Sequence, residues 1–184
     1  MKTLLLLATL LLFTPSIRAA DLDDTLKPLY EEFTALDKAQ KWSQQANMLL
    51  SDDLQSFKEL LIKAYETAKA KVKKDGSVSS LAFTTFKSKE ALDGLSPEDV
   101  YIAIREKTVM PPEMAAKMPP IVYERARQEG STVWIDVSTV SPASNKPIHA
   151  SLEMVKKEGK WFFRLPQMIT QSVEAEIENN KTNG

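Results

Sequence analysis

The spacing of apolar residues changes along the chain from a helical period to alternation. Between residues 22 and 49 apolar side chains recur every three or four positions, which predicts an amphipathic helix with a polar break at 37–41. A second stripe over 54–72 predicts a longer helix. The short polar residues at 51–53 are typical of its start, and the lysine-rich run that ends in glycine at 74–76 is typical of its end.

A serine cap and several prolines mark the remaining helix boundaries. Pro28 interrupts the first stripe, so we expect the firm part of that helix to begin near it. Ser96 is followed at once by a proline and, three residues on, by an acid, which predicts a helix start. The VSSLAFTTF stretch at 78–86 fits a strand or a helix, and both assignments stay open. The proline-bounded run at 110–120 has room for only one or two helical turns.

The last third of the chain alternates apolar and polar residues and predicts an antiparallel meander. The predicted strands cover 121–128, 131–140, 148–155 and 161–165. Gly130 and Gly159 stand at turns where glycine takes a positive φ without steric cost. A terminal helix at 168–177 and a flexible tail at 179–184 follow. We therefore predict one α+β domain over 21–178, with N-terminal helices packed on a curved antiparallel sheet of four or five strands.

The first twenty residues have the layout of a cleaved secretory signal. Lys2 precedes an apolar run at 3–13, and the small residues Ala19 and Ala20 suit a signal peptidase. The run is too short for a transmembrane helix, although an uncleaved membrane anchor is the alternative. No cysteine stands near the predicted cut, which excludes lipid attachment there. We therefore expect residues 1–20 to be removed and the protein to be secreted or periplasmic.

The composition excludes several classes of function. The chain has no cysteine, which rules out disulfides and favours a bacterial cell envelope as its location. Without Lys2 and Arg18, the 24 basic residues fall to 22 against 25 acidic residues, a net charge of −3, so no basic field is present to hold nucleic acid. The five glycines are not clustered, and the chain has neither a phosphate loop nor a Gly-x-Ser-x-Gly elbow. We expect no cofactor.

Two stretches resemble the nuclear-transport-factor-two-like superfamily of cone-shaped, cystatin-like α+β domains. FTALDKAQKWSQQANMLLSDDL looks like the first helix, break and second helix of that superfamily. ARQEGSTVWIDVSTV and SLEMVKKEGKWFFRLP together look like the final hairpins of its small secreted members. The resemblance implies a curved sheet wrapped around a long helix, a pocket at the open end, and sheet faces that often pair in dimers. It implies no activity, because the superfamily includes isomerases, dehydratases, transport adaptors and many uncharacterised secreted domains.

His149, the only histidine, is the candidate for acid–base catalysis. With Asp136 as its orienting partner it could act as a general base near neutral pH. Both residues alternate with apolar neighbours, so we expect both to point away from the apolar face and from any pocket that this face lines. We therefore interpret His149 as a solvated strand residue. One histidine without cysteine also argues against a structural zinc site.

Met110, Met114 and Met118 recur at steps of four. Three thioethers on one helical face could hold a soft ion such as Cu(I). We favour a different interpretation, a flexible lid or core patch between the two Pro-Pro pairs, because methionine adapts to irregular surfaces. The three methionines are therefore candidate ligand or lid residues.

Tyr123, Arg125 and Arg127 are expected on one side of the first predicted strand, with Trp134 across from them. This set could bind an anionic or aromatic partner, or it could form an ordinary half-exposed sheet surface, which we favour. Tyr123, Arg125 and Trp134 complete the list of candidate ligand residues.

The predicted core is not accompanied by a convergent set of polar residues. We therefore expect a non-enzymatic secreted domain that binds a small apolar ligand, a peptide or another envelope protein. The alternative is an isomerase- or hydrolase-like enzyme, which needs Asp136, His149, Glu153 or a tyrosine in the largest pocket. Copper binding by the methionines is a second alternative, and a homodimer is a further expectation.

Overall fold

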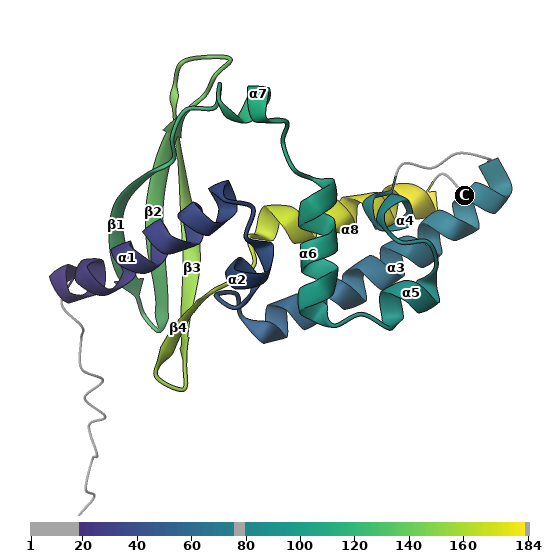
Figure 1. The fold of residues 1–184 in the computed structure, drawn as a ribbon, viewed down its shortest axis with the longest axis horizontal. Coiled ribbons are helices and arrows are strands. Elements are labelled where there is room, and N and C mark those ends of the chain that lie inside the picture. The colour runs from purple at the N-terminus through teal and green to yellow at the C-terminus, as the bar shows by residue number, and fades with distance from the viewer. Residues whose placement is uncertain (1–18, 76–79, 183–184) are drawn as a thin grey trace, which may run out of the picture.

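The computed structural model describes residues 19–75 and 80–182 (Figure 1). Residues 1–18, which hold most of the predicted signal sequence, lie outside this part. So do residues 78 and 79, the start of the 78–86 stretch for which the sequence allows a strand or a helix. The helices are α1 (Ala19–Lys38), α2 (Trp42–Ala46), α3 (Ser51–Asp75), α4 (Leu81–Thr85), α5 (Lys89–Asp93), α6 (Pro97–Lys107), α7 (Pro112–Ala115) and α8 (Gln167–Thr182). The strands are β1 (Val122–Glu129), β2 (Thr132–Val140), β3 (Pro147–Lys157) and β4 (Lys160–Phe163).

The four strands form one open antiparallel sheet in the order β1-β2-β3-β4, which confirms the α+β prediction of helices packed on a four-stranded sheet. The described residues form no fifth strand. The last hairpin has a two-residue turn in which Glu158 and Gly159 have φ values of 53° and 82°. Two positive φ angles are the signature of a type I′ turn, whose twist matches that of the strands.

Helix α1 lies across the middle of the sheet and covers one face of it (Figure 1). It begins at Ala19 and contains Pro28, so the predicted start near Pro28 is wrong. Leu22, Leu26 and Tyr30 are all buried. Because packing of an apolar stripe supplies most of the stability of a helix in a protein, it outweighs the one hydrogen bond that an interior proline removes.

The apolar sides of β2, β3 and β4 meet α1 in the core. Ile135 is fully buried, Met154 is nearly so, and the ring of Phe163 stacks on that of Phe33 with 4.3 Å between their centroids. Trp161 is partly buried against the same cluster. The predicted contact between the apolar side of the last hairpin and the preceding helices is therefore present.

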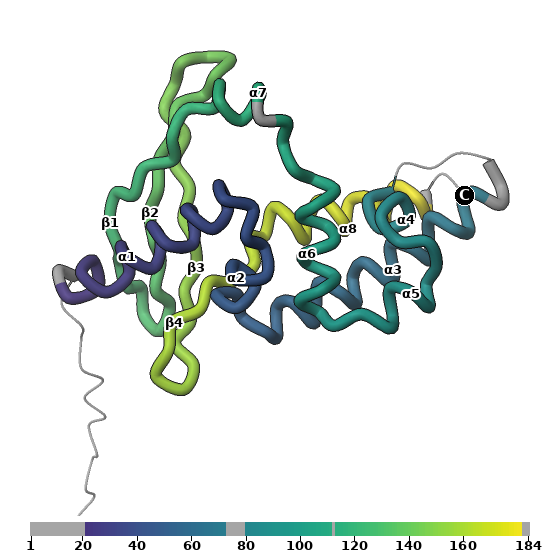
Figure 2. Tube along the Cα trace, viewed as in Figure 1, coloured from purple at the N-terminus to yellow at the C-terminus, as the bar shows by residue number. Residues whose placement is uncertain are grey.

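The other helices pack mainly on one another, beside the sheet (Figure 2). The long helix α3 contacts α8, α6, α4 and α5. Of the 78–86 stretch, for which the sequence allows a strand or a helix, residues 81–85 are helical. The Ser80 side chain caps this helix by accepting a hydrogen bond from the Phe83 amide at 3.2 Å. Helix α8 continues to Thr182, past the predicted start of the tail at 179, and Asn180 is buried. No helix of the described residues has the length and apolarity needed to cross a membrane.

A buried polar cluster joins α1, α2 and α6. The side-chain amide of Gln45, which is 1% exposed, donates to Asp37 Oδ1 at 3.0 Å and accepts from the Tyr101 hydroxyl at 2.8 Å. Arg105 Nη2 donates to the same Asp37 oxygen at 2.6 Å, and its guanidinium lies 4.5 Å from the centroid of the Trp42 ring. Burial raises the pKa of Tyr101 to about 12, so its hydroxyl keeps its proton.

Both edges of the sheet are closed by hydrogen bonds from the N-terminal half. On β1, the Ala126 amide donates to Asp23 of α1, and just before this strand the Ile121 carbonyl accepts from the Tyr30 hydroxyl. On β4, the Phe163 amide donates to the Met48 carbonyl and its carbonyl accepts from the Leu50 amide. An edge strand with free amides and carbonyls invites another strand to pair with it, and these bonds use such groups at both edges.

Candidate functional site

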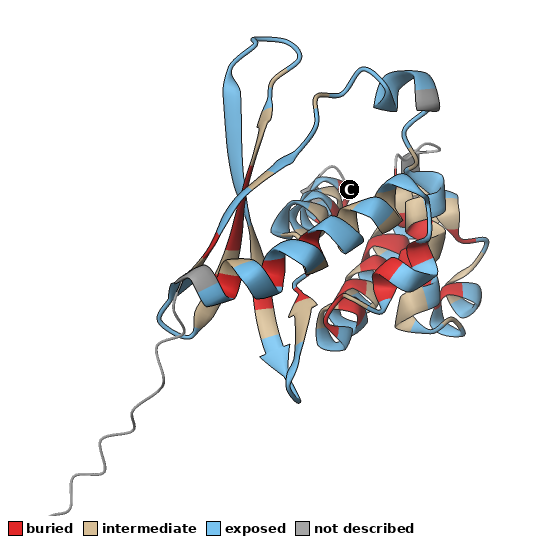
Figure 3. Ribbon diagram, turned by 60° about the vertical axis from the view of Figure 1, so that its left-hand side comes forward, coloured by how far each residue is buried: buried red, intermediate tan, exposed pale blue. Residues whose placement is uncertain are grey.

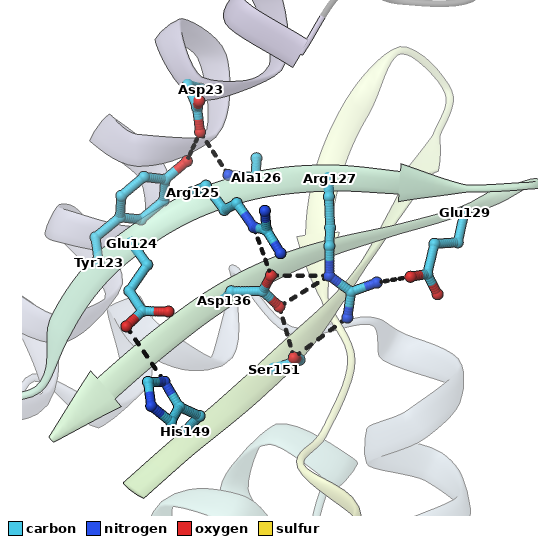
Figure 4. A network of polar contacts seen from close by, with 10 residues as sticks. All are labelled: Asp23, Tyr123, Glu124, Arg125, Ala126, Arg127, Glu129, Asp136, His149 and Ser151. Atoms are coloured by element: carbon cyan, nitrogen blue, oxygen red, sulfur yellow. Dashed lines mark hydrogen bonds and ion pairs between the residues drawn. The ribbon is translucent and has the colours of Figure 1, made fainter. Parts of the chain in front are cut away.

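The outer face of the sheet, opposite α1, carries a polar network centred on Asp136 (Figure 4). Its carboxylate accepts from Arg127 Nε at 2.8 and 3.0 Å, from Arg125 Nε at 3.1 Å and from the Ser151 hydroxyl at 2.6 Å. Arg127 also pairs with Glu129. Asp136 points away from the apolar face, as predicted, and is only 9% exposed. Two guanidinium groups from the neighbouring strand cover it.

A β-bulge in β1 separates two residues that the sequence placed together. The pairing with β2 shifts between Tyr123 and Arg125, so Tyr123 lies opposite Val137 and Arg125 lies opposite Asp136. Tyr123 thus joins the α1 side, where its ring lies 5.7 Å from that of Tyr30 and its hydroxyl donates to Asp23. The prediction that Tyr123 and Arg125 share a face is therefore wrong, because an extra residue in one strand reverses the alternation.

The predicted neighbour of the arginines is present. Trp134 lies opposite Arg127 in the register of β1 and β2, and the Arg127 guanidinium carbon is 5.7 Å from the centroid of the indole ring. Glu153, the other predicted acid, lies near Arg164 with 3.5 Å between Oε1 and Nη1.

His149 is not paired with Asp136. Its Nδ1 lies 3.3 Å from Glu124 Oε1, and its side chain is 65% exposed, as expected for a solvated strand residue. An open hollow of about 540 Å³ includes both His149 and Asp136 in its wall, together with Arg125, Arg127 and Ser151. The arrangement that was expected of a catalytic pair, a carboxylate that orients the imidazole, is absent from this hollow.

The environment of Asp136 does not suit a general base. Burial alone would raise the pKa of Asp136, but hydrogen bonds from Ser151, Arg127 and Arg125 outweigh it and hold the pKa below its usual range. A base that works near neutral pH needs a pKa close to that pH, whereas the pKa of Asp136 is shifted down, away from neutral pH. Its contacts join β1, β2 and β3, which indicates a structural role.

A second candidate is apolar and lies at the end of the sheet that α1 leaves uncovered (Figure 3). We call it the sheet-end surface. It consists of Val122, Val140 and Ile148 on the strands, with Ile121, Met110, Met114 and Met118 in the connection from α6 to β1. Val122 and Val140 lie on the same face as Asp136, whereas Ile148 lies on the α1 side, so this surface extends over both faces of the sheet at its end. These seven side chains are 39% to 60% exposed. Among the described residues, only Met168 joins them as an exposed large apolar side chain.

The strand residues of this surface are tied together by the sheet. Ile148 on β3 lies opposite Thr139 on β2, and the Thr139 hydroxyl donates to the Pro119 carbonyl at 3.4 Å. That bond places the chain leading into β1 beside the end of β2. The connection from α6 therefore reaches the same end of the sheet that carries Ile121 and Ile148.

The three methionines do not share one helical face. Helix α7 covers only Pro112–Ala115, so Met114 is helical while Met110 and Met118 lie outside the helix. Prolines on both sides limit α7 to about one turn. All three side chains are exposed, which fits a lid or surface patch and excludes a core patch. The Cu(I) hypothesis stays a prediction without the helical geometry that suggested it.

Comparison with known proteins gives no family for this chain: no family model, no curated protein and no solved structure matches it. The resemblance to the nuclear-transport-factor-two-like superfamily therefore stays a prediction. Among the described residues, no group of three or more histidine, cysteine, aspartate or glutamate residues is placed to hold a metal ion.

Proposed function

We propose that this protein is a non-catalytic binding domain of the bacterial cell envelope or the secreted fraction, and that its sheet-end surface holds an apolar segment of a partner protein. The observation that carries the proposal is the clustering of exposed apolar side chains. Seven of the eight exposed large apolar residues among those described lie at this end of the sheet, on both of its faces or in the connection that leads to it. Apolar residues gathered at one place on a soluble domain mark an interaction site, whereas scattered ones need no explanation.

The chemistry of the surface favours a protein partner. Methionine is flexible and polarizable, and surfaces that accept varied apolar partners use it heavily. A charged lipid surface is a poorer fit, because binding to it calls for a cluster of four to eight basic residues. The segments 107–122 and 139–148 hold only Lys107, Lys117 and Lys146 against Glu113.

Recognition through side chains fits better than addition of a strand. The Ala126 amide on β1 and the Ile121 carbonyl just before that strand already bond to α1, and both backbone groups of Phe163 on β4 bond to residues 48–50. A partner strand would have to displace these bonds before pairing. A helix or loop that lays apolar side chains on Ile148 and the neighbouring exposed residues of the α1 side displaces none of these bonds.

The enzyme alternative has less support. Asp136 and His149 both line the hollow on the outer face, but Asp136 is held by two arginines and His149 by Glu124. The polar groups there bond to one another and do not converge on an empty position. A catalytic site needs such a position within reach of its acid or base.

Site-specific photo-crosslinking in cells that produce the protein tests the proposal. A photoreactive residue replaces Ile148 in one variant and Glu174, which is exposed on α8, in the control. We expect Ile148 to give a discrete adduct with another protein, and Glu174 to give none. Adding Ile121→Ser should abolish the adduct, and it should weaken binding of the purified partner at least about tenfold, as loss of a central apolar contact does.

Two results would contradict this assignment. Equal labelling from Ile148 and Glu174 would show that the sheet-end surface has no specific occupant. An adduct of twice the mass of this chain would assign the surface to a second copy, in agreement with the expected homodimer, and would replace the partner protein in the proposal.

A further inference from the structure

Strand β3 is longer than β4, and the part of it that β4 does not reach forms a further length of sheet edge. The pairing of β3 with β4 covers only residues 154–157, and beyond it the Glu153 carbonyl accepts from the Arg164 amide at 2.9 Å. Residues 147–152 pair with β2 on one side only. Figure 1 shows β3 continuing past β4 toward the turn that joins it to β2. The bonds that close β1 and β4 do not involve these residues.

Alternate backbone groups of this stretch point away from β2. The Ser141 amide donates to the Lys146 carbonyl at the head of the β2–β3 pairing, so the backbone groups of the even-numbered residues from 148 to 152 face β2. The amides of His149 and Ser151, and the carbonyls of residues 147, 149 and 151, face the open edge. No described residue bonds to any of these groups. Such a row of free amides and carbonyls is a template for another strand.

Nothing within this stretch protects the edge against pairing. Proteins usually protect an edge strand with charged side chains, a bulge or a covering element. Strand β1 carries four charged residues and is bonded to α1, whereas the stretch 147–152, PIHASL, contains no aspartate, glutamate, lysine or arginine. Its first five residues are all exposed, and no bulge interrupts its pairing with β2. Only Pro147, which has no amide, sets a limit to the length that can pair.

The side chains beside this edge define the segment that fits it. Ile148 and Ala150 are exposed on the α1 side, followed there by the half-buried Leu152. His149 and Ser151 lie on the outer side. Side chains of an added strand alternate in the same way, so apolar ones would meet Ile148 and Ala150 while polar ones would meet His149 and Ser151. A segment without charged residues fits best, because this stretch offers no charge to pair with them.

We propose that residues 147–152 of β3 bind an extended, uncharged segment of the partner protein, which adds to the sheet as a strand beside β3. This inference rests on the proposed function, because Ile148 belongs both to the sheet-end surface and to this edge. Strand addition at β1 or β4 would break existing bonds, whereas addition at this part of β3 breaks none. The partner thus pairs with β3 through its backbone and lays its apolar side chains on the sheet-end surface.

Amide hydrogen exchange followed by NMR tests the edge in the purified protein. Without a partner, the amides of His149 and Ser151 should exchange at least about tenfold faster than those of Ala150 and Leu152, which bond to β2. The uncharged peptide acetyl-Thr-Val-Thr-Val-Thr-Val-amide should cause saturable shifts at residues 148–152 and slow the exchange at His149 and Ser151. Slow exchange at these two amides before the peptide is added, or no saturable shift with it, would overturn the proposal.

A matched pair of variants separates backbone pairing from side-chain contact. His149→Pro removes an amide that faces the open edge and breaks no bond to β2, whereas His149→Ala removes the side chain and keeps the amide. We expect His149→Pro to lower the affinity for the peptide, and the yield of the Ile148 photo-adduct in cells, at least about tenfold. His149→Ala should change each by less than about threefold. Equal effects of the two variants would contradict pairing through the backbone.

Failure of this inference and failure of the proposed function give different results. An Ile148 adduct that is unchanged in His149→Pro would contradict pairing at β3 and leave the sheet-end surface as the binding site. Peptide shifts at His149 and Ser151 without any Ile148 adduct would support the edge and contradict the proposed function. A dimer of the purified protein that His149→Pro dissociates would assign the edge to a second copy and overturn the partner segment. If His149→Pro does not fold, exchange and peptide shifts in the unsubstituted protein decide.

Discussion

The two ends of the same sheet are built from the same alternating pattern but differ in how far their apolar side chains are buried. Ile135 on β2 is completely buried under α1, whereas Ile148 on β3 is 48% exposed at the end that α1 does not reach. Both residues lie on the side of the sheet that carries its apolar residues. Alternation of apolar and polar residues therefore determines which face of the sheet a side chain points to. The length and position of the covering helix determine whether that face is buried.

The largest effect should come from removing an apolar group at the covered end. Ile135→Ala leaves a cavity in a packed core, so we expect the free energy of unfolding to fall by about 2–5 kcal/mol. Denaturation in urea measures the loss. Ile148→Ala provides the matched control, and an equal loss in both variants would show that the two ends do not differ in burial.

The next effect concerns the network that joins β1, β2 and β3 on the outer face. Asp136→Asn weakens the acceptor of Arg125, Arg127 and Ser151, and we expect a loss of about 1–3 kcal/mol in the free energy of unfolding at pH 7. Glu124→Gln, a change in a more exposed carboxylate of the same face, should cost less than about 0.5 kcal/mol.

The pH dependence of the Asp136 effect has a defined sign. Because the pKa of Asp136 is lowered in the folded protein, its stabilisation is fully present above the ordinary aspartate value of 3.8 and is lost as the pH falls through the folded-state pKa. The stability difference between the wild type and Asp136→Asn should therefore be constant near neutral pH and shrink below pH 3.8. A difference that grew on acidification would contradict the arrangement.

A smaller and local effect is expected where α1 closes the edge of β1. Asp23→Ala removes the acceptor of the Ala126 amide and the Tyr123 hydroxyl, so hydrogen exchange at Ala126 should become about five- to tenfold faster, the factor expected for one lost hydrogen bond. Asp24→Ala makes the same change at the next, exposed position of α1 and should leave that rate unchanged. Equal rates in all three proteins would show that Asp23 does not hold the edge.

The smallest effect on stability belongs to the uncovered end. Ile148→Ser should change the free energy of unfolding by less than about 0.5 kcal/mol, because an exposed side chain has little burial to lose. The same variant should bind the partner protein more weakly. A large loss of stability would mean that another part of the molecule covers Ile148.

Much of the architecture followed from local patterns. The strands and their turns came from alternation and from Gly130 and Gly159, and both glycines have a positive φ. The helix that begins after Ser96 came from its cap, whose side chain accepts from the Asp99 amide at 3.1 Å. These features depend on a few adjacent residues, so the sequence displays them directly.

Features that depend on distant parts of the chain could not be predicted. The position of Asp53 indicates a helix-start residue. Asp53 also accepts from Arg164 Nε at 2.8 Å and from the Leu165 amide at 3.0 Å, which ties the end of the sheet to α3. Burial of Asp136 depends on arginines that only strand pairing brings close. The alternation of residues does not reveal the bulge beside Tyr123, so it predicts the wrong face for that residue.

The methionines themselves offer the most direct test that the two ends of the sheet differ. In a methionine-methyl NMR spectrum recorded with a soluble paramagnetic agent, the methyl signals of Met110, Met114 and Met118 should broaden strongly, while that of Met154, which is 1% exposed beneath α1, should not. Protection of Met114 equal to that of Met154 would contradict the existence of an uncovered apolar surface at this end of the sheet.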